Sequence, residues 1–408
     1  MRMLAILIAR FAALASRLAG NEGTSLPGML ATKIDSKILN KLSSEISRGI
    51  VLVTGTNGKT TTANITTKIL EDAGYRVISN KIGANMYNGI ASAFLLEAPL
   101  TGHLQADYAV LEVDELYTVP ICKDLTPKYF VVTNLFPDQI DRMGSIEDVR
   151  AAINRALKHT ISSDTTLVLN LDNPDSAQLS KMSTREIVFF SVTEPVDYHA
   201  SDITEDDTLS FIAHTPDTEA PFVTNMRGLY NVSNILGALV VTTGEGISLE
   251  DSAKTLADYQ TQPGRMERFV VEGKPVIINM AKNPAGFNYS LESANNSGGT
   301  FDVYFVTNNT VADGVDIDWY EHIELEQYEK EGPRNFYVGG DCSDDMAQRL
   351  RDAGINWNRI RIVQPQADGI HKALQGSGDT LYVIANYSAV FPLRKELLER
   401  ADVVSEPA

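Results

Sequence analysis

The sequence predicts an α/β protein with a central parallel sheet and a second, smaller α/β domain. Its 408 residues and 44.6 kDa exceed what one hydrophobic core usually serves, so two or three domains are expected. Short apolar runs rich in β-branched residues alternate with segments of helical spacing, as in strands separated by helices. This alternation is interrupted near residue 176 and resumes in the last third of the chain.

The first half of the chain carries the strands and helices of the central sheet. The expected strands are residues 50–54, 75–78, 108–113, 129–133 and 166–171, and the expected helices are residues 63–73, 90–96, 145–159 and 231–243. Because strands alternate with helices, we expect a parallel sheet covered on both faces.

The segment 176–223 differs from its surroundings, since Thr, Asp and Pro are scattered among short alternating runs. We expect it to be a small β-rich, peripheral insertion. The turn Gln262-Pro263-Gly264 then predicts the end of the central domain. The expected domains are residues 1–48, an N-terminal helix and connector, residues 49–265, the central domain, and residues 266–408, the C-terminal domain. Strands are expected in the last domain at residues 276–280, 303–306, 335–338, 360–363 and 381–384, and helices at residues 344–353, 369–374 and 393–400.

Charge and cysteine content exclude several classes of protein. A net charge of -18 argues against a general nucleic-acid binder, because nothing here would neutralise a row of phosphates, and it leaves a local basic pocket open. Cys122 and Cys342 are the only cysteines, which rules out a disulfide framework and a cysteine-rich zinc site. These features fit a protein of the reducing cytoplasm.

Residues 1–18 begin with an apolar run that Arg10 and Arg17 interrupt, which argues against a signal peptide. We expect a helix whose apolar stripe packs on the body of the protein. The alternative is a helix that touches the inner surface of the membrane. The stripe consists of Leu4, Leu7, Ile8, Phe11, Leu14, Ala15 and Leu18.

Residues 54–61, TGTNGKTT, have the composition of a loop that binds the phosphates of ATP. A triphosphate needs converging backbone N–H groups, small residues and a cation. Gly55 and Gly58 allow close approach, and Lys59 reaches the β and γ oxygens. The Thr60 hydroxyl can bind Mg²⁺ at the start of the helix. Two residues separate the glycines where the general pattern has four, so the flanking strand and helix support the prediction. The expected nucleotide-binding residues are Gly55, Thr56, Asn57, Gly58, Lys59, Thr60 and Thr61.

Acidic residues close the expected strand 108–113. Mg²⁺ prefers oxygen ligands and takes few protein groups, so one carboxylate at a neighbouring strand end is the expected partner of Thr60. Glu112 is that candidate. The alternative is that Glu112, Asp114 and Glu115 form an ordinary acidic loop.

A further polar cluster, residues 134–142, follows the strand 129–133. It either orders substrate and metal-bound water or caps the helix that begins near Ser145. The residues alone leave both interpretations open.

Several motifs together resemble the Mur ligase superfamily, whose members phosphorylate a carboxylate with ATP and let an amine attack the acyl phosphate. These motifs are TGTNGKTT at 54–61, LEVDE at 111–115, TNLFPDQIDR at 133–142, GLYNVSN at 228–234 and PGR at 263–265. Within the superfamily the chain most resembles the MurT family, the ligase subunits of lipid II isoglutaminyl synthases. The blocks that carry this resemblance are LPG at 26–28, AKNPAGFN at 281–288 and ADGVDIDW at 312–319.

The resemblance implies a role for each matching residue of the central domain. Lys59 would hold the phosphates, and Thr60 with Glu112 would hold Mg²⁺. Asn231 and Asn234 would contact the nucleotide, although helix capping is the alternative for both.

Other implied residues lie at the end of the central domain and beyond it. Arg265 would close on the phosphates, and Lys282 matches a cationic position that faces ATP after domain closure. Asp316 would assist the catalytic histidine of a glutaminase partner, and Asp313 and Asp318 are alternatives for that role. Family members commonly carry four cysteines as a zinc ribbon, but residues 172–222 contain none, so no zinc is expected.

The resemblance implies amidation of the α-carboxylate of D-glutamate in the lipid II stem peptide, which gives D-isoglutamine. A glutaminase needs an activated cysteine on a tight, glycine-flanked turn, and neither Cys122 nor Cys342 has that setting. The ammonia is therefore expected from a separate GatD-like glutaminase subunit. The alternatives are an amino-acid-adding ligase of the peptidoglycan or folylpolyglutamate type, and a non-catalytic nucleotide-binding scaffold.

Overall fold

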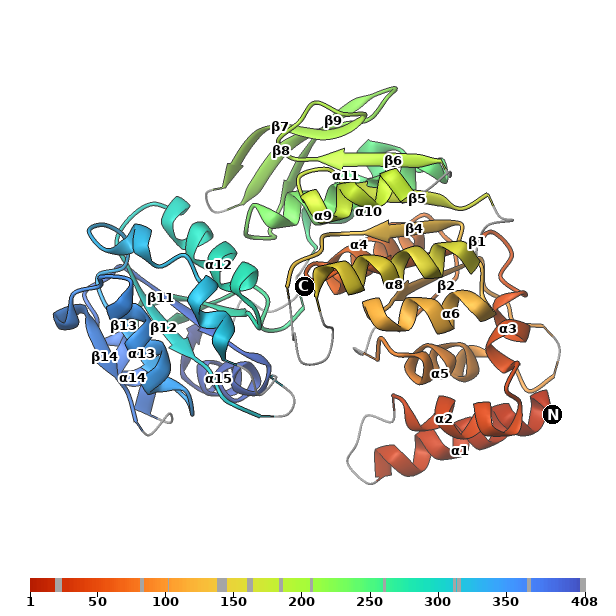
Figure 1. Cartoon of the computed structure of the whole chain (residues 1–408), viewed down its shortest axis with the longest axis horizontal. Coiled ribbons are helices and arrows are strands. Elements are labelled where there is room, and N and C mark those ends of the chain that lie inside the picture. The colour runs from red at the N-terminus through yellow and green to blue at the C-terminus, as the bar shows by residue number, and fades with distance from the viewer. Residues whose placement is uncertain are drawn as a thin grey trace. The chain divides into compact units, whose positions relative to one another are not determined.

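The chain forms two compact units, which are described separately (Figure 1). The first comprises Met1–Ile203, Ser210–Val223 and Tyr230–Ala257, and the second comprises Thr204–Leu209, Thr224–Leu229 and Asp258–Ala408. The predicted divisions after residues 48 and 265 stay predictions. The computed structural model describes residues 1–18, 24–80, 84–101, 103–137, 145–159, 164–182, 186–205, 208–259, 262–310, 313, 317–364 and 368–403.

A nine-stranded sheet has the order β2-β3-β1-β4-β5-β6-β7-β8-β9. Its first seven strands pair in parallel, and the central strand β1 lies between β3 and β4. This arrangement confirms the predicted parallel α/β sheet. The β-rich segment is not separate from it, because β6 to β9 continue the same sheet. The strands are β1 (Gly49–Thr54), β2 (Val77–Ser79), β3 (Tyr108–Glu112), β4 (Tyr129–Val132), β5 (Thr166–Asn170), β6 (Ile187–Ser191), β7 (Tyr198–Glu205), β8 (Leu209–His214) and β9 (Glu219–Thr224).

Helices cover both faces of the parallel part of this sheet (Figure 1). On one face, α5 (Tyr87–Glu97), α6 (Thr118–Asp124) and α8 (Ile146–His159) share a buried core with Ile50 and Leu52 of β1. On the other, α4 (Lys59–Asp72) packs against α10 (Tyr230–Gly244) and α11 (Leu249–Ala257). The alternation of side chains along β1 places the two cores on opposite faces. Among the described residues, this unit also has the short helices α3 (Ile38–Ser43), η1 (Glu115–Tyr117), α9 (Pro174–Gln178) and η2 (Leu179–Met182).

The N-terminal helix α1 (Arg2–Leu18) packs on α2 (Leu26–Ile34) and α5, but not through the predicted stripe. Its buried residues are Ala5, Ile6, Ala9, Ala12 and Ala13. Leu4, Leu7, Phe11, Leu14 and Leu18 of the predicted stripe are exposed, and Ile8 is half-buried. The expected packing face was therefore wrong. Both faces of the helix are apolar, and the small side chains allow the closer contact between helices.

The second unit holds a seven-stranded sheet of order β14-β13-β12-β15-β11-β10-β16. Strands β14 to β11 pair in parallel, whereas β10 pairs antiparallel with both of its neighbours. Phe287 of α12 packs on Phe305 of β12, while α14 and α15 cover the opposite face. This confirms the predicted second α/β part. The strands are β10 (Glu267–Val271), β11 (Lys274–Met280), β12 (Phe301–Val306), β13 (Phe336–Gly339), β14 (Ile360–Ile362), β15 (Thr380–Ala385) and β16 (Ala401–Val403), and the helices are α12 (Pro284–Asn296), α13 (Ser343–Asp352), α14 (Gly369–Leu374) and α15 (Tyr387–Arg400).

Candidate nucleotide-binding site

The loop 55–58 joins the buried strand β1 to the first turn of α4. Gly55 and Gly58 have φ values of 131° and 81°, in the region that favours glycine. A Cβ at Gly55 would collide with Thr133, and one at Gly58 would collide with the side-chain oxygen of Asn234. The two glycines therefore let the loop lie directly against its neighbours. The N–H groups of the first helical turn, which lack helical partners, can face an anion there.

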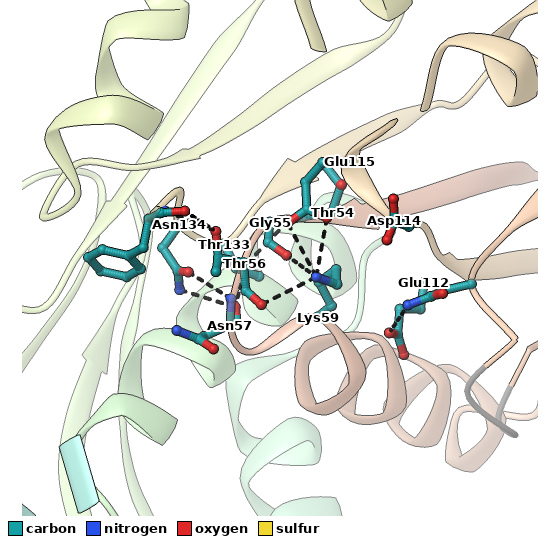
Figure 2. Close-up of polar contacts among 12 residues, drawn as sticks. Thr54, Gly55, Thr56, Asn57, Lys59, Glu112, Asp114, Glu115, Thr133 and Asn134 are labelled. Atoms are coloured by element: carbon teal, nitrogen blue, oxygen red, sulfur yellow. Dashed lines mark hydrogen bonds and ion pairs between the residues drawn. The ribbon is translucent and has the colours of Figure 1, made fainter. Parts of the chain in front are cut away.

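Asn134, which follows β4, holds the loop from the other side (Figure 2). Its side-chain oxygen accepts a hydrogen bond from the Asn57 amide at 2.9 Å, and its Nδ2 donates to the Asn57 carbonyl at 3.1 Å. The Thr133 hydroxyl donates to the same carbonyl at 2.6 Å. These contacts show that the end of β4 shapes the phosphate loop. The sequence analysis had offered two other roles for this cluster, ordering of substrate and metal-bound water or capping of a helix. Residues 138–142 of the cluster lie outside the described residues.

Lys59 is buried at the base of the loop, with its ammonium group among oxygen atoms (Figure 2). It donates to the carbonyl of Gly55 and, at 3.3 Å, to that of Thr56. It also forms an ion pair at 3.3 Å with Glu115, whose side chain is 1% exposed. The loop thus holds a buried cation that Glu115 stabilises, and its contact with the phosphate oxygens stays a prediction.

The sequence predicted no role for Glu115, which appeared only in the alternative of an ordinary acidic loop. Glu115 begins the short 3₁₀ helix η1, and the preceding Asp114 accepts a hydrogen bond from the Leu116 amide. This turn directs Glu115 toward the loop. The signal in the sequence was a third acid directly after the strand end, but spacing alone does not tell which of the acids points inward.

Thr60 and Glu112 lie together at the mouth of the loop. The Thr60 hydroxyl donates to Oε2 of Glu112 at 2.7 Å. The other carboxylate oxygen accepts from Asn85 at 3.1 Å, and Asn80 bonds the Glu112 backbone at both its N–H and its carbonyl. One hydroxyl and one carboxylate are hard oxygen donors beside a phosphate loop, which suits Mg²⁺, an ion that binds few protein groups. Within the described ranges, no group of three or more His, Cys, Asp or Glu side chains is placed to hold a metal ion.

Asn231 and Asn234 are buried in the first two turns of α10. Asn234 donates to Oδ1 of Asn231 at 2.9 Å and lies against Gly58. Because Asn231 follows the first residue of α10 and Asn234 lies in its second turn, neither occupies the capping position. Their nucleotide contacts remain a prediction, and the structure brings Asn234 to the phosphate loop.

The two predicted nucleotide contacts of the second unit flank its first two strands, since Arg265 precedes β10 and Lys282 follows β11. Arg265 donates to the Met280 carbonyl at 3.2 Å. Lys282 is half-buried, beyond the carboxyl end of β11 and directly before Asn283, which caps α12. Their positions relative to the phosphate loop stay predictions.

The three candidate aspartates for the partner contact differ in setting. Asp316 lies outside the described residues. Asp313 is buried and accepts hydrogen bonds from the Ser388 hydroxyl at 2.6 Å and from the Thr310 hydroxyl at 2.5 Å. Asp318 is exposed at the start of η3 (Asp318–His322). The Asp313 carboxylate is therefore already engaged within its own unit.

Two family models match the chain. The Mur ligase middle domain matches residues 53–242, which hold the phosphate loop, Glu112 and both asparagines. The MurT ligase C-terminal domain matches residues 280–390.

Curated relatives cover nearly the whole chain. It is 30% identical to the "Lipid II isoglutaminyl synthase (glutamine-hydrolyzing) subunit MurT" of Staphylococcus aureus (strain COL), over 96% of this chain and 97% of that protein. The subunit of the same name from Streptococcus pneumoniae (strain ATCC BAA-255 / R6) is 28% identical over 94% of each chain.

Solved structures support the fold. MurF from Acinetobacter baumannii superposes with a TM-score of 0.75 at 16% identity, covering 91% of this chain and 80% of that chain. MurF from Thermotoga maritima, solved in complex with ADP, has a TM-score of 0.73 at 20% identity, covering 91% of this chain and 85% of that one.

Proposed function

The chain belongs to the MurT family of the Mur ligase superfamily, a group of ATP-dependent amide ligases, and from this premise we propose that it amidates lipid II. The proposed substrate is the α-carboxylate of D-glutamate in the stem peptide, and the product is D-isoglutamine. The relatives in S. aureus and S. pneumoniae, which are named as subunits of lipid II isoglutaminyl synthase, support this choice. The proposal depends on one observation: the side chains of Lys59, Thr60 and Glu112 lie together at one phosphate loop.

The proposed reaction has two steps. A carboxylate oxygen attacks the γ-phosphorus of ATP, and ADP leaves, which yields an acyl phosphate. Ammonia then adds to the acyl carbon, and phosphate leaves with the loss of one proton. The Lys59 ammonium and the loop N–H groups offset the charge that spreads over the phosphoryl oxygens in the first step.

Thr60 and Glu112 would hold Mg²⁺, which supplies a further positive charge beside the phosphates when it is bound. Glu115 would keep the Lys59 ammonium in place while the site fills. Asn234, packed against Gly58, would hold the loop in the shape that its N–H groups need. For Arg265 and Lys282 we propose contacts with the nucleotide once the two units close on it.

The nitrogen source is proposed to be a separate GatD-like glutaminase subunit. Cys122 and Cys342 are both buried, and burial raises the pKa of the Cys342 thiol above its ordinary value. A protonated, buried thiol is a poor nucleophile for glutamine hydrolysis. Asp316 stays the proposed contact with the partner, since Asp313 already bonds Ser388.

We propose a cytoplasmic enzyme that works at the inner face of the membrane, where lipid II presents its stem peptide. No zinc is proposed, because residues 172–222 contain no cysteine, and the insertion is held by its own packing. Phe211 of β8 stacks on Phe222 of β9 with ring centroids 5.2 Å apart, and both rings are buried.

The proposal is tested with the purified chain, lipid II, ATP and a choice of amines. Ammonium salts should support amidation by the chain alone, and glutamine should do so only after a glutaminase subunit is added. Lys59→Ala should lower kcat by about 10²–10³-fold, as when one preorganised charge-stabilising donor is lost. The matched control is Lys254→Ala, because Lys254 pairs with Asp251 on the surface with 76% of its side chain exposed.

Each alternative has a distinct outcome in this assay. Product formation with an amino acid in place of ammonia would favour an amino-acid-adding ligase. Unchanged amidation by Lys59→Ala would favour a scaffold that only binds nucleotide. Use of glutamine by the isolated chain would refute the separate nitrogen source.

A further inference from the structure

Helix α1 turns its large apolar side chains away from the protein. The buried face consists of alanines and Ile6. The opposite face carries exposed methionine, leucine and phenylalanine side chains, of which Phe11 is 73% and Leu18 81% exposed. At 3.6 residues per turn, these side chains fall within an arc of about 100°. The outward stripe consists of Met3, Leu4, Leu7, Phe11, Leu14 and Leu18.

The N-terminal segment that carries the outward stripe is basic, and two exposed arginines flank the stripe on one side. Residues 1–48 contain seven Lys or Arg and three Asp or Glu residues, a net charge of +4 in a chain whose total is -18. The two described acids of this segment are already paired, Asp35 with Lys41 at 2.6 Å and Glu45 with Arg2 at 2.5 Å. The segment therefore contains more basic residues than its own acidic residues can pair with. The basic residues include the exposed Arg10 and Arg17 along one flank of the stripe and the exposed Lys33 and Lys37 at the end of α2 and after it. Arg10 also donates a hydrogen bond to the Ala98 carbonyl at 2.7 Å.

We propose that the outward face of α1 binds the surface of an anionic phospholipid bilayer. The stripe would enter the boundary between headgroups and acyl chains, and the flanking cations would meet the lipid phosphates. Charge complementarity favours an anionic surface as the occupant of this face. Residues 49–408 are strongly negative and would be repelled by such a surface, so the basic N-terminal segment would be the part that turns toward it. The 17 residues of α1 span about 25 Å, enough to lie flat on the surface. Among the residues that the structure describes, no helix is long and apolar enough to cross a membrane.

A second copy of the chain is a less suitable occupant of the same face. Joining two α1 faces would bring two basic segments together, which costs electrostatic energy that a bilayer contact gains. The bilayer contact also does not depend on which carboxylate the enzyme activates. Its test therefore uses vesicles without lipid II or ATP, so its result is independent of the proposed reaction.

The experiment measures flotation of the full chain with phosphatidylglycerol vesicles and with phosphatidylcholine vesicles. The wild type should partition onto the anionic vesicles, less at high salt and less onto the neutral ones. Leu7→Ser with Phe11→Ser should weaken this partition by about tenfold or more, because two apolar side chains lose their burial. The control is Ile362→Ser with Phe391→Ser, which removes comparable exposed side chains (42% and 45%) from the second unit and should change partition by less than about twofold.

A charge variant keeps the test valid if the serine variant is unstable. Arg17→Glu, at an exposed position in the last turn of α1, should lower binding to anionic vesicles and leave the melting temperature unchanged. Absence of wild-type binding to anionic vesicles would overturn the proposal. So would a wild-type dimer that the serine variant dissociates, or a serine variant that loses its glutaminase partner while still floating with vesicles.

Discussion

Replacing Gly58 with alanine would perturb the phosphate loop by an amount that the structure allows to be worked out. Gly58 has φ 81° and ψ -7°, where a residue with a Cβ is strained by about 1–2 kcal/mol. The new Cβ would also collide with Oδ1 of Asn234, which is only 5% exposed. Because Asn234 also bonds Asn231 at 2.9 Å, the collision is relieved most readily by moving the loop.

We expect Gly58→Ala to lower the free energy of unfolding by about 2–3 kcal/mol and to weaken ATP binding by about 100-fold or more. The matched control is Gly74→Ala beyond the other end of α4. Gly74 has φ 89°, and no described atom lies within 4 Å of a Cβ built there. Gly74→Ala should therefore lower the free energy of unfolding by about 1 kcal/mol and leave the affinity for ATP unchanged.

Urea unfolding gives the stability of both variants, and calorimetric titration with a non-hydrolysable ATP analogue gives the affinity. The comparison separates backbone strain, which both variants share, from the collision with Asn234, which only Gly58→Ala has. Wild-type affinity in Gly58→Ala, or an equal loss of affinity in the two variants, would refute the reasoning.

Further predictions concern the metal, the buried ion pair and the anchoring of α1. Thr60→Val removes a hydroxyl at the proposed metal site, so the Mg²⁺ concentration for half-maximal activity should rise by about tenfold in a magnesium titration; an unchanged titration would exclude Thr60 as a ligand. Glu115→Gln leaves the buried Lys59 ammonium without its carboxylate and should lower nucleotide-free stability by about 2–3 kcal/mol. Mg-ATP, by adding phosphate charge beside Lys59, should raise the melting temperature of this variant more than that of the wild type, and equal shifts would contradict the role of Glu115. Burial acts to raise the pKa of Glu45, but a backbone amide and the Arg2 guanidinium outweigh it and hold the pKa below its ordinary value. The stability that this contact contributes is present above about pH 4.3 and lost as the pH falls through the lowered pKa. Arg2→Met should move that loss to higher pH in melting curves, whereas an unchanged acid limb would show that the pair contributes nothing.

The local signals of the sequence predicted the sheet and the phosphate loop. Short β-branched runs identified β1, β3 and β4, and the residues of one contiguous loop carried Lys59 and Thr60. Glu115 could not be chosen in advance, because its contact with Lys59 spans 56 positions and depends on the turn at η1.

The packing face of α1 shows a different limit of sequence analysis. Periodicity identifies an apolar stripe, but α1 has two, and the larger side chains of Leu7 and Phe11 were wrongly assigned to the core. The alanine face packs because small side chains let helices approach. Helix α12 was not among the expected helices. Pro284 occupies its first turn, where the missing N–H costs nothing, and Asn283 caps the helix.

The central claim is that this chain activates a carboxylate by γ-phosphoryl transfer at the loop of Lys59. Its most direct test uses lipid II labelled with oxygen-18 in the α-carboxylate of D-glutamate, with ATP, ammonium and the purified chain. Mass spectrometry of the released phosphate should show one labelled oxygen for each amide formed, and Lys59→Ala should slow the release of labelled phosphate and the formation of amide by the same factor. Amide formation with unlabelled phosphate, or with the label in AMP, would contradict the acyl-phosphate mechanism.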